Sequence, residues 1–93
     1  MMNKVEQHDI LCGELHDLYV RKNAAYGDSF GDTFHKLGII SAITRITDKY
    51  NRLVTLVTNP KISPNDESIS DTLIDLSNYC LMTMIEIENE RSE

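Results

Sequence analysis

The chain has 93 residues, of which 41% are hydrophobic and 26% are charged, and its formal net charge at pH 7 is −6. A chain this short buries a limited share of its surface, so we expect one domain over residues 1–93 that self-associates into a homo-oligomer. The negative charge argues against binding to a DNA or RNA polymer, because phosphate backbones require a basic protein surface. It still allows a small nucleotide accompanied by Mg²⁺, because the metal supplies positive charge locally.

The sequence shows no sign of export or membrane insertion. Its first residues contain no apolar signal region, and no apolar run approaches the roughly 20 residues that span a bilayer. We therefore expect a cytoplasmic protein without a membrane partner. Cys12 and Cys80 lie far apart, each within an apolar helical stretch. Outside a secretory setting we expect both to be buried free thiols.

The first half of the chain predicts one long helix followed by a loop. From about residue 3 to residue 25, Leu11, Leu15, Leu18 and Tyr19 share one face at the helical period. Residues 26–32 then contain two glycines and two aspartates, a composition typical of a loop. A short helical turn is expected over residues 33–37.

The second half predicts two more helices. Apolar residues recur every three or four positions from about residue 37 to residue 58, which indicates an amphipathic helix. After a loop at 59–63, Ser63 suits a helix cap and Pro64 a first helical position, and this last helix should run to about residue 90. The expected fold is all-α, a compact bundle of three main helices plus the short turn.

The last helix carries an unusual acidic stripe. Glu67, Asp71, Asp75 and Asn78 fall on one face, and the helix contains no lysine or arginine before Arg91. Carboxylates at this spacing repel one another, and Mg²⁺ would relieve the repulsion because it prefers carboxylate oxygens and water. A solvated or salt-bridged face explains the same stripe equally well.

The preceding helix carries a complementary basic face. Arg45, Lys49 and Arg52 lie on or beside its polar side, together with Asp48. Two arginines seven residues apart point the same way and can clamp a phosphate chain through forked hydrogen bonds. The alternative is a set of salt bridges to the acidic stripe, and both can hold in the absence of a ligand.

A third group of candidate residues surrounds the first loop. It combines a cation, two aromatic rings and several polar groups on a flexible turn, which suits a loop that closes over a ligand with a ring stacked on a base. The alternative is a structural turn whose aromatic rings fill the core. The residues concerned are Lys22, Asn23, Tyr26, Asp28, Ser29 and Phe30.

Three ordered motifs resemble the nucleotide-modification-associated domain family, type 1, small proteins found mostly in phages and prophages. They are KNAAYGDSF at residues 22–30, RITDKYNRL at 45–53 and ESISDTLIDLSNY at 67–79. The resemblance covers roughly residues 18–86 and implies a role in handling nucleotides, in the host cytoplasm if the protein is phage-encoded. It places the nucleotide-binding residues at the loop group, at Arg45, Lys49 and Arg52, and at Asn78.

The order of the motifs is also distantly similar to that of MazG-like all-α nucleotide pyrophosphohydrolases, which hold Mg²⁺ with acidic residues on two helices. That similarity implies Glu67, Asp71 and Asp75 as catalytic residues, and these three with Asp48 as metal ligands. The chain departs from that pattern because its long helix lacks the paired glutamates of the group. Three hypotheses remain: a Mg²⁺-dependent nucleoside triphosphate pyrophosphohydrolase, an anti-defence protein that sequesters a nucleotide-derived immune signal, and a structural helical adaptor.

Overall fold

The backbone of residues 1–92 forms four helices and no strand in the computed structural model, which describes side chains up to residue 90. The helices are α1 (Lys4–Tyr26), α2 (Ser29–Leu37), α3 (Ile39–Thr58) and α4 (Glu67–Ser92). The predicted all-α class is confirmed for these residues. Within them, no helix has both the length and the apolar character needed to cross a membrane.

Helix α2 begins four residues earlier than the sequence suggested, so the predicted loop over residues 26–32 is wrong in its second half. The Asp28 carboxylate accepts a hydrogen bond from the Gly31 backbone N–H at 3.3 Å, which caps the helix. An aspartate in this position satisfies one of the backbone donors that a helix start leaves free. Two glycines in the segment obscured this cap signal.

Glycines make the two sharp corners between α1, α2 and α3. Gly27 and Gly38 have φ angles of 70° and 76°, a conformation that side-chain-bearing residues rarely adopt. Each donates its N–H to the carbonyl four residues earlier, Asn23 O and Phe34 O, and so ends α1 and α2 respectively. These corners bring the end of α1 next to α2.

The last helix begins at Glu67, so the cap predicted at Ser63 and Pro64 is wrong. The carboxylate of Asp66 instead accepts hydrogen bonds from the Ser68 hydroxyl and the Ser68 backbone N–H. These two bonds, the side-chain one first, hold the pKa of Asp66 below its usual value. Ser63 accepts from the Asn65 N–H at 3.3 Å and from the Asp66 N–H at 2.9 Å, so it forms a turn instead.

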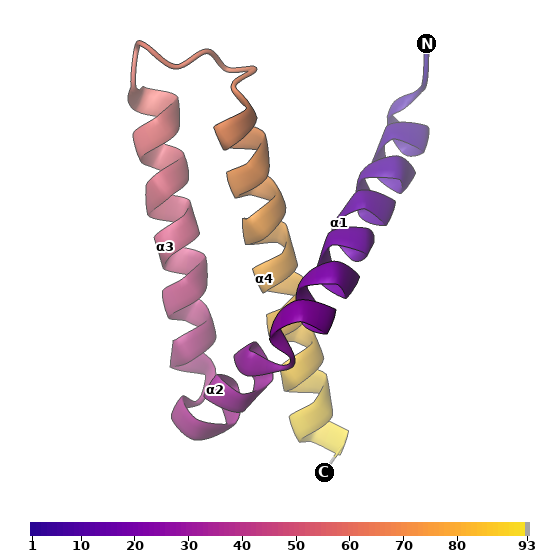
Figure 1. Ribbon diagram of the computed structural model, residues 1–93, viewed down its shortest axis with the longest axis vertical. Helices are drawn as coiled ribbons and strands as arrows, with labels where there is room; N and C mark the ends of the chain where they lie inside the picture. The colour runs from indigo at the N-terminus through magenta and orange to yellow at the C-terminus, as the bar shows by residue number, and fades with distance from the viewer. Residues whose placement is uncertain (93) are drawn as a thin grey trace.

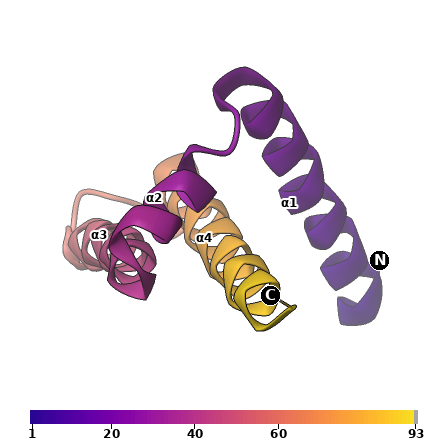
Figure 2. The same ribbon diagram turned by 90° about the horizontal axis from the view of Figure 1, so that it is seen from below.

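Helices α3 and α4 lie side by side and antiparallel, and they form the principal packing contact of the fold (Figure 1). Helix α2 packs against both at one end, and α1 lies beside α4, away from α3 (Figure 2). Among the described residues, the buried apolar side chains are Phe34 of α2, Ala42 of α3 and Ile69 of α4. Phe34 and Ala42 lie near the corner between α2 and α3, whereas Ile69 lies near the start of α4, at the opposite end of the α3/α4 pair.

Helix α1 is held only loosely. None of its residues is buried, and its N-terminal half points away from α3 and α4 (Figure 1). The radius of gyration is 15.1 Å, whereas a compact domain of this length would have roughly 12 Å. The predicted compact bundle is therefore not confirmed. Cys12 and Cys80 are free as predicted, but both are exposed, so their predicted burial is wrong.

We expect Gly31→Ala to destabilise the fold by about 1 kcal/mol, the usual value of a helix cap. A Cβ atom at Gly31 would lie 2.5 Å from Asp28 Oδ2, so the capping carboxylate would have to move. Gly13→Ala is the matched control, because nothing lies within 4 Å of its Cβ position in the exposed interior of α1. That change should stabilise the fold by up to about 1 kcal/mol. Urea unfolding checks both, and equal stability of the two variants would contradict this account of the cap.

Candidate functional site

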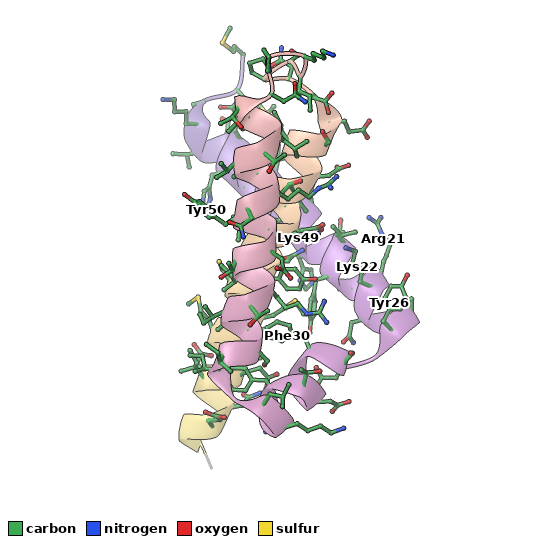
Figure 3. The ribbon with its side chains drawn as sticks, turned by 90° about the vertical axis from the view of Figure 1, so that its left-hand side faces the viewer. Arg21, Lys22, Tyr26, Phe30, Lys49 and Tyr50 are labelled. Atoms are coloured by element: carbon green, nitrogen blue, oxygen red, sulfur yellow. The ribbon has the colours of Figure 1, made fainter. Side chains whose placement is uncertain are left out.

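The carboxylate of Asp75 connects α4 to two other helices. Its Oδ1 atom lies 3.3 Å from Lys22 Nζ of α1, and its Oδ2 atom lies 3.0 Å from Lys49 Nζ of α3. The Asp75 and Lys49 side chains are 25% and 27% exposed, whereas Lys22 is 54% exposed. Lys22 and Lys49 lie on the same side of α3 (Figure 3). The acidic stripe therefore meets cations within one chain through Asp75, and Lys49 of the predicted basic face is one of the two partners.

Asp75 is ionised in this setting. Partial burial by itself would raise the pKa of its carboxyl group, but the hydrogen bond from Lys49 and the charge of Lys22 together outweigh that effect. The pKa consequently lies below its usual value. A carboxylate held between two ammonium groups fixes both lysine side chains at the edge of the neighbouring pocket.

That pocket has a volume of about 420 Å³ and lies between the end of α1, the start of α2 and the middle of α4. Its size is within the range of small-molecule sites in proteins. Four aromatic rings, two cations, two amides and two carboxylates contribute to its wall. The lining residues are Tyr19, Lys22, Asn23, Tyr26, Gly27, Asp28, Ser29, Phe30, Arg45, Asp75, Asn78, Tyr79 and Met82.

Two of the aromatic rings form a stacked pair in the wall. The rings of Phe30 and Tyr79 have centroids 5.9 Å apart and planes inclined by 20°. Phe30 is half-buried because the first turn of α2 directs it toward α4. Tyr26, by contrast, is 77% exposed at the last residue of α1. The pocket thus has a fixed aromatic surface and a further ring beside it that is largely free of contacts.

Polar groups line the rest of the pocket. Asn78 donates a hydrogen bond from Nδ2 to the Leu15 carbonyl of α1 at 3.2 Å, which holds its amide against that helix. Arg45 lines the pocket from α3 and makes no ion pair with any side chain up to residue 90. An exposed guanidinium group in this position is available to a negatively charged ligand.

The structure gathers most of the predicted nucleotide-binding residues around this one pocket. Arg52 and Lys49 are not part of the pocket wall. Lys49 does form an ion pair with Asp75, which lines the pocket. Eight line the pocket: Lys22, Asn23, Tyr26, Asp28, Ser29, Phe30, Arg45 and Asn78. Four other lining residues were not among the predicted site residues: Tyr19, Gly27, Tyr79 and Met82. Tyr79 directly follows Asn78 in the third motif, and this position was the feature of the sequence that could have identified it as a site residue.

The predicted metal ligands do not converge. Asp71 and Asp75 line a smaller hollow of about 280 Å³ together with Lys22, whereas Glu67 and Asp48 are exposed and not part of it. In the described part of the chain, no group of three or more His, Cys, Asp or Glu side chains could hold a metal ion. Because Asp75 is also occupied by two lysines, this donor set does not fit Mg²⁺ as arranged. No catalytic step through a metal follows from it.

The sequence of this region decides the family. Residues 22–87 match the family described as nucleotide modification associated domain 1. The chain belongs to that family. Comparisons with curated proteins and with solved structures gave no match. A phage origin and a similarity to MazG-like pyrophosphohydrolases stay predictions.

Asp75→Asn should lower the stability of this family member by on the order of 1 kcal/mol at neutral pH, because two lysines lose their shared anion. Asp71→Asn is the matched control, since Asp71 makes no ion pair with a described side chain. The folded-state pKa of Asp75 lies below its usual value of 3.8. Its stabilising contribution is therefore complete above that value and is lost as the pH falls through the lower, folded-state pKa.

Chemical unfolding at a series of pH values checks this prediction. The stability difference between the wild type and Asp75→Asn should be constant at pH values well above 3.8 and should shrink as the pH is lowered below 3.8. Equal stability of Asp75→Asn and Asp71→Asn at neutral pH would contradict a structural role for the Asp75 bridge.

Proposed function

We propose that this protein binds a phosphorylated nucleotide in the pocket between α1, α2 and α4. The observation that carries the proposal is the composition of the pocket wall. A stacked aromatic pair and two cationic side chains line the same cavity of about 420 Å³. A nucleotide presents the complementary chemistry, because its base offers a flat π surface and its phosphates offer negative charge. Membership of a nucleotide-associated family supports the same ligand class.

The balance of charge around the pocket favours an anionic ligand despite the chain's net charge of −6. Lys22 and Arg45 in the wall are balanced by Asp28 and Asp75. Lys49 lies outside the wall and forms an ion pair with Asp75. With Lys49 included, the net charge of these five side chains is positive. The Asp28 carboxylate is also engaged at the start of α2. Phosphate oxygens would therefore meet Lys22 and Arg45 as their principal partners.

The aromatic groups suit the other end of the ligand. Phe30 and Tyr79 are already stacked on one another, so they offer a fixed wall without further ordering. Tyr26 stands at the end of α1 directly before Gly27, with most of its surface exposed. In the proposed complex Tyr26 covers the base, and its exposure decreases when the nucleotide binds.

The proposal has two forms: in one the protein retains the nucleotide intact, and in the other it cleaves the nucleotide. Retention requires only the aromatic rings and the cations, which fits a protein that sequesters a nucleotide-derived signal. Mg²⁺-dependent cleavage requires Asp71 and Asp75, which share the smaller hollow, to exchange Lys22 for a metal ion. The present arrangement favours retention, because Asp75 is bonded to lysines on both of its oxygens. A purely structural adaptor would leave the pocket without a ligand.

Binding can be tested by titration calorimetry with the four deoxynucleoside triphosphates, their monophosphates and cyclic dinucleotides. Arg45→Ala and Lys22→Ala should each weaken the binding of any nucleotide by roughly ten-fold to a hundred-fold, the usual result of losing one charge-assisted contact. Lys61→Ala is the matched control, because Lys61 is an exposed lysine in the loop between α3 and α4. If Lys61→Ala weakened binding equally, the effect would come from the overall charge of the chain and not from the pocket. If none of the nucleotides in the panel bound, the proposal would be refuted.

Turnover is tested with the same nucleotides in Mg²⁺ and then in EDTA, with release of pyrophosphate or phosphate as the readout. Retention predicts that intact nucleotide is recovered from denatured protein in both conditions, and that Asp71→Asn binds as the wild type does. Release that requires Mg²⁺ and is abolished by Asp71→Asn would replace retention with hydrolysis. The pocket would remain the binding site in that case.

A further inference from the structure

One face of the α3/α4 pair consists of apolar side chains that no residue of the described part of the chain covers. We call it the α3/α4 apolar face and define it as Ile43, Tyr50, Val54, Val57, Leu73 and Met84. These side chains are between 40% and 57% exposed. At about 100° per residue, the four on α3 fall within about 60° of arc, and the two on α4 within about 20°.

This face points away from the nucleotide pocket. Arg45 lines the pocket from α3 and stands about 180° around the helix from Val54. On α4, Met82 lines the pocket, and Met84 follows about 160° away. Figure 3 shows Tyr50 on one side of α3, and Lys49, Lys22 and Phe30 on the other. Helix α1 lies beside α4 on the far side from α3, so it does not cover the face (Figure 2).

The exposed surface of the chain is larger than that of a typical folded monomer of its mass. The accessible area is 7169 Å², whereas a folded monomer of 10.6 kDa exposes roughly 5,500 Å² by the usual scaling with mass. The excess is about twice the roughly 800 Å² that each partner buries in a standard protein interface. Helix α1 contributes part of this excess, and the remainder leaves room for the area that a standard interface buries.

The chemistry of the face suits a second copy of the same chain. None of its six residues is charged, so two such faces meet without like-charge repulsion despite a net charge of −6 on each chain. Polar uncharged residues border it, with Thr47 and Asn51 beside it on α3 and Ser77 beside it on α4, and Glu88 stands one turn beyond Met84 at one end. An apolar centre with a polar rim is the usual composition of a protein interface. The negative net charge disfavours an anionic lipid surface as the alternative occupant.

We propose that two copies of this chain associate through the α3/α4 apolar face in an isologous dimer. The two antiparallel helix pairs then pack against one another as a four-helix layer. The two nucleotide pockets lie on the outer sides of this dimer and open away from each other. Dimerisation therefore does not depend on nucleotide binding.

The test is sedimentation velocity at about 100 μM protein, a concentration at which mass action populates even a weak dimer. We expect the wild type to sediment with twice the mass of the 10.6 kDa chain. Tyr50→Glu and Met84→Glu each place a charge in the face and should raise the dimer dissociation constant by more than about ten-fold. Both positions are 53% or more exposed, so neither substitution disturbs the core.

Two matched controls introduce the same charge at exposed apolar positions on other faces. Ile85→Glu is adjacent to Met84 in sequence but about 100° away around α4, and Leu11→Glu lies on α1 with an exposure of 54%. Both variants should remain dimeric. A monomeric wild type overturns the proposal, and so does a dimer that either control dissociates while Tyr50→Glu and Met84→Glu leave it intact. If circular dichroism shows that a glutamate variant has lost helix, Tyr50→Ser replaces it under the same criteria.

Discussion

The contact of one carboxylate with two lysines connects α1 to α3 and α4, and the pocket lies beside this connection. Helix α1 has no buried residue, so apolar packing alone does not attach it to the rest of the chain. Lys22 binds Asp75, and the Leu15 carbonyl accepts from Asn78, which gives α1 two polar connections to α4. Lys49 binds the other oxygen of Asp75, so the same carboxylate also connects α4 to α3. A polar contact thus performs the positioning that a larger core would otherwise provide.

This arrangement explains how a small chain can assemble a site from three separate motifs. The first motif supplies Lys22 and the turn at Gly27, the second supplies Lys49 and Arg45, and the third supplies Asp75 and Tyr79. Antiparallel packing of α3 and α4 brings the second and third together, and the two glycine corners return the first to the same place. The pocket is therefore a product of tertiary structure, although each motif is a local feature of one helix or turn.

Periodicity and composition predicted the helices well, because the apolar residues of α3 repeat at the helical spacing and the loop after it contains both prolines. The predictions failed where a local hydrogen bond decided the outcome. Asp28 starts α2 within the segment predicted as a loop, and Asp66 precedes α4, where Ser63 was predicted as the cap. The acidic stripe left a metal site and a salt-bridged face equally open, and the structure shows salt bridges at one of its carboxylates. Its spacing fixes a helix face but does not reveal that Asp75 alone reaches the lysines on two other helices.

The broad apolar surface of α4 acquires two roles in this account. One flank, with Asn78 and Met82, contributes to the pocket, and the opposite flank, with Leu73 and Met84, belongs to the α3/α4 apolar face. The sequence places apolar residues on both of these flanks of α4, but it could not show which flank faces a ligand. That assignment depends on where α1 and α2 lie, and only contacts distant in sequence determine this.

The most direct measurement is a titration of ¹⁵N-labelled protein with dATP, in which the amide resonances of the pocket and of the α3/α4 apolar face are followed together. The account predicts shifts at Gly27, Phe30 and Tyr79, which line the pocket, and unchanged resonances at Val57 and Met84 on the other side. Unchanged pocket resonances at saturating dATP, or shifts confined to Val57 and Met84, would contradict it.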